Sequence, residues 1–383
     1  MTKLRVFFTF AFYKKMKFMK LKRSEEMLLA LLCAALHQRE VEIGYFQQVT
    51  ADDWVQCYRL AVRQGVSALA WEGIERLPVT YTPPLDVKVS WALLEKKQLA
   101  TYRKHCQAVN ELTQFFAQHG IATVVLKGVG LSRLYPVPAH RESGDIDIYT
   151  YSVDKKRMTD EEANRLANEL MERQGLHIER FNRELHNSFN YRGITFENHW
   201  RFFNIDIYTE LSQVETWLKK CLSPQSVSLL DDNCQISVPL IIFDRVFVSL
   251  HAAKHYGNGL LLRHLCDWVV LNQQEGLKYP EELDNKYFLQ TTTVLSQLTN
   301  RYLGSSISVG GNDKLANAMM KEIMRPPSYV MFSSDNAIRA GWCKIRLKLH
   351  LLGLRKRLLG VPVWRSVMFY IISILSKPSR LYR

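Results

Sequence analysis

Gly144-Asp145-Ile146-Asp147-Ile148, near the middle of a chain of 383 residues, has the alternation of a short strand. Because side chains alternate along a strand, Asp145 and Asp147 project from one face, while the two isoleucines face the core. Two carboxylates held this close repel each other, and burying them without compensation costs free energy. A divalent cation removes that cost, and Mg²⁺ prefers a few carboxylates together with water and phosphate oxygens. The stretch therefore predicts a strand that carries two ligands of Mg²⁺ or Mn²⁺.

The residues upstream of this pair favour a phosphate-binding turn. An Asp-x-Asp pair by itself also occurs on solvated edge strands, so its surroundings matter. Ile121–Leu126 is an apolar run of strand length, and Lys127-Gly128 turns it into a short helix. Free backbone N–H groups and the helix dipole at such a turn attract phosphate, and Lys127 adds a point charge. A plain turn glycine beside a solvated lysine is the alternative.

A third carboxylate is expected on a neighbouring strand. Glu197 lies in an alternating run, 194–200, that pairs with 188–191 around Arg192-Gly193. Asp206, a polar residue between two isoleucines, is its rival. The pattern alone leaves both residues open as the third ligand.

These blocks carry a resemblance to a known family. The runs are Val125-Leu126-Lys127-Gly128-Val129-Gly130-Leu131-Ser132-Arg133-Leu134-Tyr135-Pro136, then Arg141-Glu142-Ser143-Gly144-Asp145-Ile146-Asp147-Ile148, then Phe196-Glu197-Asn198-His199-Trp200, and finally Leu250-His251-Ala252-Ala253-Lys254-His255 with Leu262-Arg263-His264-Leu265-Cys266-Asp267-Trp268. From roughly Ser24 to Asn272 the chain resembles the uncharacterised bacterial nucleotidyltransferase family of the DNA polymerase β superfamily. It departs from the superfamily fingerprint, which has Gly-Ser at the turn where this chain has Lys127-Gly128. A hydroxyl contact to the phosphates is therefore left open.

The resemblance implies a metal-dependent transfer of a nucleoside monophosphate from an NTP to an acceptor hydroxyl, with release of pyrophosphate. It favours Glu197 over Asp206 as the third carboxylate, placed to activate the acceptor. The implied catalytic and metal-binding residues are Asp145, Asp147 and Glu197; the implied nucleotide-binding residues are Lys127, Gly128, Arg141 and Gly144; and His199, His255, Arg263 and Asp267 are expected to border the cleft.

Some of these residues have a second interpretation. Arg141, four residues before Asp145, either contacts the triphosphate or forms a salt bridge with one of the acids. His251 and His255 share a helix face, either as a metal-binding pair or as a packed pair near the sheet. Arg263 and Asp267 have the spacing of an intrahelical ion pair.

The predicted fold class is α+β, with a small mixed sheet as the nucleotidyltransferase core and helical lobes on either side. Helix-like spacing before residue 119 and after 214, with short alternating runs between them, suggests this order. The expected divisions are a basic N-terminal extension (1–23), a helical lobe (24–118), the nucleotidyltransferase core (119–214), a second helical lobe (215–330) and a basic C-terminal helical tail (331–383).

The formal charge of +14 is concentrated at the chain ends. Residues 1–23 hold eight basic side chains and residues 336–383 hold eleven, with no acid in either segment, so the middle is net acidic. A long nucleic acid is therefore a less favoured acceptor than a sugar, another small molecule or a protein. The basic C-terminal segment, which includes the apolar run 361–376, suits either contact with an anionic membrane or docking on the protein.

The cysteines and the N-terminus suggest a compartment. Seven scattered cysteines without close spacing indicate reduced thiols, and the apolar run Val6–Tyr13 lacks a signal-peptide cleavage site. We expect a cytoplasmic protein, peripheral to the inner face of the membrane if its C-terminus binds lipid. The rival functions are a non-catalytic nucleotide- or partner-binding protein of the same fold and a peripheral membrane scaffold.

Overall fold

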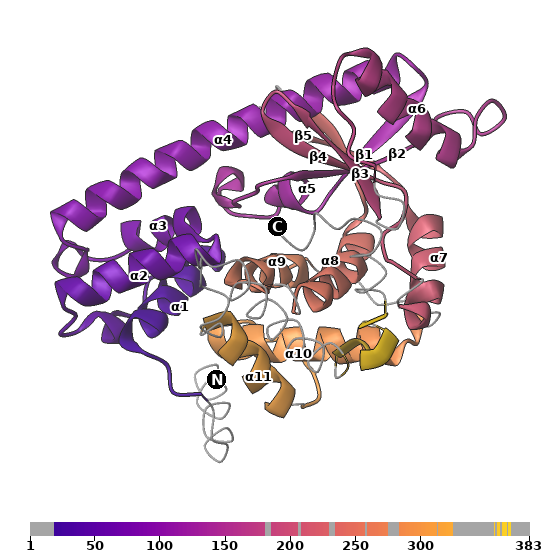
Figure 1. Ribbon diagram of the computed structural model, residues 1–383. Coiled ribbons are helices and arrows are strands. Elements are labelled where there is room, and N and C mark those ends of the chain that lie inside the picture. Colours follow the sequence, from indigo (N-terminus) through magenta and orange to yellow (C-terminus); the bar gives the residue numbers. More distant parts are fainter. Residues whose placement is uncertain are drawn as a thin grey trace, which may run out of the picture.

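The computed structural model describes residues 19–180, 185–205, 208–229, 234–256, 259–274, 283–311, 313–324, 356, 358–360, 362–365 and 367–368. A first group of helices, α1 (Arg23–Leu36), α2 (Ala51–Gln64) and α3 (Ser67–Glu75), packs together at the N-terminal side (Figure 1). Two short 3₁₀ turns accompany them: η1 (Ile43–Phe46) lies between α1 and α2, and η2 (Val79–Tyr81) follows α3. Helix α2 begins with a capping box, because the Thr50 hydroxyl accepts the Asp53 N–H while the Asp53 carboxylate accepts the Thr50 N–H.

The long helix α4 (Leu85–Ala117) crosses the molecule from these helices to the sheet (Figure 1). Its first half packs on α3, and its second half packs on β1 and β6. One helix is thus shared by the N-terminal bundle and the sheet, so these two parts are built on a common support.

The sheet has four strands in the order β1-β2-β4-β3. They are β1 (Ile121–Leu126), β2 (Ile146–Ser152), β3 (His186–Tyr191) and β4 (Ile194–His199). The pairs β1–β2 and β3–β4 are antiparallel, whereas β2 and β4 are parallel. The predicted α+β class with a small mixed sheet is confirmed. Helix α6 (Asp160–Arg173) packs on β2.

The remaining helices lie below the sheet in Figure 1. They are α7 (Ser212–Cys221), α8 (Ile241–His255), α9 (Leu262–Asn272), α10 (Lys286–Tyr302) and α11 (Asp313–Met324). Three short elements are α5 (Gly128–Ser132), η3 (Pro138–His140) and η4 (Thr209–Leu211), and described residues between 356 and 368 are also partly helical. Buried residues of α1–α3 and of α8–α11 belong to one hydrophobic cluster, while the second half of α4, the sheet and α6 form another. The two helical segments of the sequence therefore share a core.

The structure also contains a hairpin where the sequence suggested only helix. Strands β5 (Gln225–Leu229) and β6 (Cys234–Val238) pair in antiparallel register, and β6 packs beside β1. Leu229, Ile236 and Val238 are buried in the sheet's cluster. Two five-residue strands give too short an alternation to stand out from their helical surroundings.

The C-terminal segment is described only in part. Leu358 and Leu359 are buried in the larger cluster, and Arg365 pairs with Glu210 at 3.2 Å, so these residues dock on the protein. Residues 1–18 of the predicted N-terminal extension and most of the predicted tail lie outside the described residues. Within the described part, no helix is both long and apolar enough to cross a bilayer.

Candidate active site

Three carboxylates meet on one face of the sheet. Strands β2 and β4 run parallel with Asp147 directly opposite Glu197, and Asp145 precedes β2 by one residue. Oxygen atoms of Asp145, Asp147 and Glu197 all lie within 4.8 Å of one another. Asp147 is buried, while Asp145 and Glu197 are partly accessible. The rival third carboxylate, Asp206, lies outside the described residues.

Asp147 is held by a cation and a histidine. Lys127 Nζ lies 2.9 Å from Oδ2, and His199 Nε2 lies 2.9 Å from Oδ1, which it meets as donor because an ionised carboxylate only accepts. Burial alone would raise the pKa of Asp147, but Lys127 and His199 outweigh it and hold that pKa well below its usual range. Burial likewise opposes the charged form of His199, yet its hydrogen bonds to Asp147 and Glu197 raise its pKa. Asp147 is therefore ionised at any physiological pH, with both oxygens engaged.

The pKa of Asp145 is shifted in the opposite direction from that of Asp147. Burial and the neighbouring charge of Asp147 raise its pKa, and Lys127 offsets only part of that effect. Two carboxylates in one site thus differ in how readily they give up a proton. An added cation would favour the ionised form of Asp145 and relieve the repulsion.

The turn after β1 directs Lys127 toward the carboxylates. Lys127 has φ 37°, and Gly128 follows with φ 43°, both in the region that disfavours residues with a Cβ. Such a backbone costs about 1–3 kcal/mol at a non-glycine residue and is retained mainly at functional positions. Helix α5 has only five residues, so its dipole is small. Any phosphate here would depend mainly on Lys127 and the free N–H groups of the turn.

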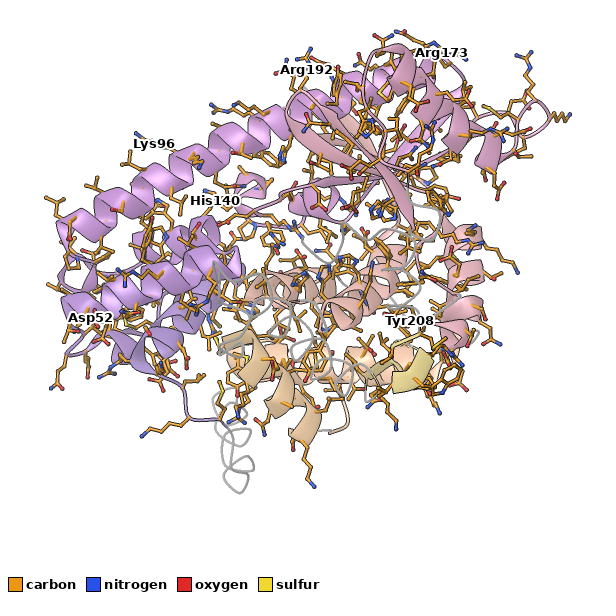
Figure 2. All side chains as sticks on the ribbon, in the orientation of Figure 1. Asp52, Lys96, His140, Arg173, Arg192 and Tyr208 are labelled. Carbon is orange, nitrogen blue, oxygen red and sulfur yellow. The ribbon has the colours of Figure 1, made fainter. Side chains whose placement is uncertain are left out.

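The loop before β2 is held in place by contacts with α3 and α4. The His140 ring, labelled in Figure 2, contacts Glu72 of α3 at 2.8 Å and Glu95 of α4 at 3.2 Å. Glu142 accepts hydrogen bonds from the hydroxyl and backbone N–H of Ser67 at the start of α3. These contacts position the loop that ends at Asp145, whereas Gly144 is exposed and a Cβ there would meet nothing within 4 Å.

Arg141 makes a buried, two-point ion pair with Asp267. Its Nε lies 3.1 Å from Oδ1 and its second terminal nitrogen 2.7 Å from Oδ2, and the Tyr135 hydroxyl donates to the same carboxylate at 2.7 Å. The salt-bridge interpretation of Arg141 therefore names the right interaction but the wrong partner, because the acid comes from α9 and not from the metal-binding set. The expected Arg263–Asp267 pair within α9 is also wrong: Arg263 donates to the Glu142 carbonyl oxygen at 3.3 Å. A loop more than a hundred residues away supplies the stronger partner.

His186 completes the surroundings of Glu197 and was not among the expected residues. It faces His199 across the β3–β4 pair, and its Nε2 lies 3.4 Å from Glu197 Oε1. Burial and the neighbouring His199 lower the pKa of His186 to about 4, so its ring is neutral near pH 7. The strand had been expected to begin at Ser188; extending the alternation back by two residues would have found it.

His255 of α8, which was expected to border the cleft, lies near this site. The charge of Lys127 contributes to lowering the pKa values of both His251 and His255, which places α8 within electrostatic reach of the turn after β1. Arg263 and Asp267 contact the loop before β2 through Glu142 and Arg141 respectively. The sequence-predicted set thus surrounds one region between the sheet and α8–α9.

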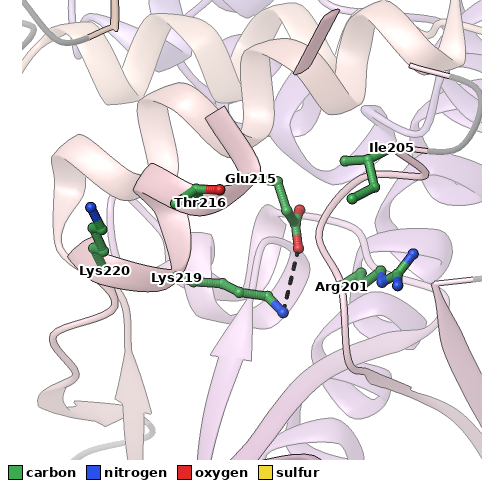
Figure 3. A pocket seen from close by; sticks show the side chains of 6 residues that line it. All are labelled: Arg201, Ile205, Glu215, Thr216, Lys219 and Lys220. Carbon is green, nitrogen blue, oxygen red and sulfur yellow. Dashed lines mark ion pairs between the residues drawn. The ribbon is translucent and has the colours of Figure 1, made fainter. Parts of the chain in front are cut away.

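A separate surface cavity of about 390 Å³ lies beside α7 (Figure 3). It is lined by Arg201, Ile205, Glu215, Thr216, Lys219 and Lys220. The Glu215 carboxylate accepts the backbone N–H groups of Phe202 and Phe203, so it fastens the loop after β4. None of the predicted site residues lines this cavity.

Comparison with known proteins identifies the family of the chain. The signature of a family described as uncharacterised nucleotidyltransferase matches residues 50–302, which is more than half of the chain. The chain belongs to this family. Membership supports a role in nucleotidyl transfer, while the family itself is uncharacterised. One solved structure, an antigenic nucleotidyltransferase-like protein from Paracoccidioides brasiliensis, is similar at 14% identity over 57% of this chain and 93% of that chain, with a TM-score of 0.36. Among curated proteins, none matches.

Proposed function

We propose that the protein is a metal-dependent nucleotidyltransferase that moves a nucleoside monophosphate from an NTP to an acceptor hydroxyl. The observation that carries the proposal is the convergence of Asp145, Asp147 and Glu197, whose oxygens lie within 4.8 Å of one another on adjacent strands. Family membership supports the same chemistry. The acceptor is proposed to be a small molecule, a sugar or a protein, and the reaction to occur in the cytoplasm.

The residues present fit Mg²⁺ or Mn²⁺. Both ions take carboxylate oxygens, and the remaining positions suit water and phosphate. Asp145, Asp147 and Glu197 would hold the metal, which when bound polarises the phosphate and lowers the charge on the transferring group. Two observations support this fit: the crowding of like charges at Asp145, and the accessibility of Asp145 and Glu197 beside the buried Asp147.

Lys127 has two roles in this scheme. Without substrate it neutralises Asp147 at 2.9 Å and keeps the acidic cluster stable. If Asp147 held a cation, Lys127 would no longer be needed to neutralise it, and its long side chain could turn toward the phosphates of a bound NTP. His199 continues to hold the other oxygen of Asp147, so the carboxylate keeps its orientation during the exchange.

The transfer itself needs one proton acceptor. The acceptor hydroxyl oxygen forms a bond to the α-phosphorus, the bond from that phosphorus to the bridging oxygen breaks, and pyrophosphate leaves with the electron pair. Glu197 is proposed to take the hydroxyl proton, since it is more accessible than the buried Asp147 and lies beside two histidines. Arg141 acts indirectly, because its guanidinium is committed to Asp267.

The test is pyrophosphate release by the full-length protein with Mg²⁺ and each of the four NTPs. Asp147→Asn keeps the shape of the side chain and should abolish release, with the fold retained by circular dichroism. Glu197→Gln and Asp206→Asn form a matched pair: the first should abolish release and the second should leave it unchanged. Unaltered release by Asp147→Asn would refute the assignment.

A missing acceptor would leave all four reactions silent, so binding is measured in parallel. Mn²⁺-dependent binding of an NTP to the wild type, lost in Asp145→Asn/Asp147→Asn, supports the proposed site. Absence of any metal-linked NTP binding would count against both catalysis and the non-catalytic nucleotide-binding alternative.

A further inference from the structure

A second group of metal-binding side chains lies outside the carboxylate cluster. His251 and His255 come from α8 and His264 from α9, and one ring nitrogen of each lies within 4.8 Å of the others. The ring centroids of His251 and His255 are 4.4 Å apart, and those of His255 and His264 are 5.0 Å apart. Three imidazoles therefore converge on one point between two packed helices.

The helices hold these rings firmly. His251 and His255 are four residues apart and share one face of α8, which packs directly on α9. His264 is buried, and its Nδ1 lies 3.2 Å from the carbonyl oxygen of Leu261. The same Nδ1 also lies 3.0 Å from the backbone N–H of Leu261. Metal binding at Nε2 would use the tautomer in which Nδ1–H donates to the Leu261 carbonyl, an orientation common among metal-binding histidines.

The other two rings have nitrogens to spare. Within the described part of the chain, neither His251 nor His255 makes a side-chain hydrogen bond, and both rings are partly accessible. Neutral rings are the form in which imidazole binds a metal.

We propose that His251, His255 and His264 form a second metal site, which binds a nitrogen-preferring ion of the Zn²⁺ class. Tetrahedral ligands at about 2.0–2.1 Å from zinc are roughly 3.3 Å apart, so modest ring rotations would bring these nitrogens together. Three protein ligands leave a fourth position for water or an oxygen of a bound molecule. The site goes beyond the proposed transferase chemistry and does not depend on it.

The two sites differ in the ions they prefer. Carboxylates suit Mg²⁺, Ca²⁺ and Mn²⁺, whereas imidazoles suit zinc and its neighbours in the transition series. Lys127, Lys254 and Arg263 add positive potential near the histidines, which disfavours a weakly held hard cation. Lys127 is partly neutralised by its 2.9 Å pair with Asp147. A metal held by strong nitrogen bonds is therefore favoured over Mg²⁺ at this point.

The test is zinc binding by the full-length protein after removal of metals with a chelator. Zinc is titrated in competition with a chromophoric chelator, and Co²⁺ is substituted to report a four-coordinate site by its visible spectrum. Loss of an outer-shell partner alone costs roughly 10- to 100-fold in metal affinity, so loss of a ligand in His255→Gln should cost at least about 100-fold. His119→Gln, at an exposed histidine on the far end of α4, should leave the affinity unchanged, and Asp145→Asn/Asp147→Asn should do the same.

X-ray absorption of the zinc-loaded wild type provides a readout that needs no variant, and three imidazole ligands are expected. Zinc should also raise the melting temperature of the wild type but not that of His251→Gln/His255→Gln. Failure of the wild type to retain zinc would overturn the proposal. So would an affinity that falls in Asp145→Asn/Asp147→Asn but not in His255→Gln, because the ion would then occupy the carboxylates.

Discussion

The ion pair between Arg141 and Asp267 is the contact whose loss should affect stability most. Asp267 is 2% exposed and accepts from Arg141 at two points and from the Tyr135 hydroxyl. Replacing Arg141 by leucine leaves a buried carboxylate with one neutral donor. Removing one partner of a buried ion pair costs about 3–5 kcal/mol. Arg263 on the same helix offers partial compensation, which places the expected loss toward the lower end of that range.

This loss converts into a measurable shift in melting temperature. At about 2.1 cal/mol/K per residue, a chain of 383 residues has an unfolding entropy of about 0.8 kcal/mol/K, so 3–5 kcal/mol corresponds to about 4–6 °C. The two helical segments share the larger hydrophobic cluster, so they should unfold together. Scanning calorimetry and urea unfolding would therefore both measure the loss of stability.

A double-mutant cycle separates the pair from its surroundings. Asp267→Leu alone leaves Arg141 buried and unpaired, and it should also cost several kcal/mol. In Arg141→Leu/Asp267→Leu the buried Tyr135 hydroxyl lacks its acceptor, and the Glu142 carbonyl and Ser143 hydroxyl lose the donor that Arg141 gave them. No buried charge is left unpaired, so the double variant should lose about 1–3 kcal/mol, far less than the sum of the single losses. Additive losses within about 0.5 kcal/mol, or a loss below about 1 kcal/mol for Arg141→Leu, would refute this reasoning.

Three other perturbations test the helix packing, the Asp147 ion pair and a buried histidine. In Gly73→Ala the new Cβ would lie 2.5 Å from a backbone oxygen of α1, so urea unfolding should show a loss of about 1–3 kcal/mol in stability. Gly144→Ala is the control: its new Cβ meets open space, and stability should change by less than about 0.5 kcal/mol. Equal losses in the two variants would contradict this expectation. Lys127→Met removes the ammonium group beside Asp147, so the melting temperature of the variant in chelator should be lower than that of the wild type. Adding Mg²⁺ should raise the melting temperature of the variant more than that of the wild type. An equal response to Mg²⁺ would count against the proposed exchange of Lys127 for a cation at Asp147. Because the pKa of His264 is lowered to about 3 in the fold and lies near 6.5 in the unfolded chain, the unfolded chain takes up the proton first. Stability should then decline below about pH 6.5 by up to about 1.4 kcal/mol per pH unit, and His264→Gln should flatten that decline in denaturant midpoints measured between pH 7.5 and 5.

Local patterns in the sequence predicted the strands of the four-stranded sheet and the common face of Asp145 and Asp147. The alternation around Asp145 and Asp147 requires one shared face, because strand geometry alone sets the direction of successive side chains. Alternation also predicted the pair of strands around Arg192-Gly193, and the apolar run Ile121–Leu126 was predicted from its strand length; the structure contains both. The short hairpin β5–β6 was missed because its alternation spans only five residues per strand.

The partners of these residues depended on the tertiary structure. The alternation left Glu197 and Asp206 open, and only the parallel pairing of β2 with β4 sets Glu197 opposite Asp147. Helical spacing favoured Arg263 as the partner of Asp267, yet Arg141 reaches that carboxylate from a loop distant in sequence. Periodicity reports which face a side chain occupies, because it follows from the local backbone. It carries no information on which distant part of the chain packs against that face, because this packing depends on how all the apolar faces of the chain are buried together.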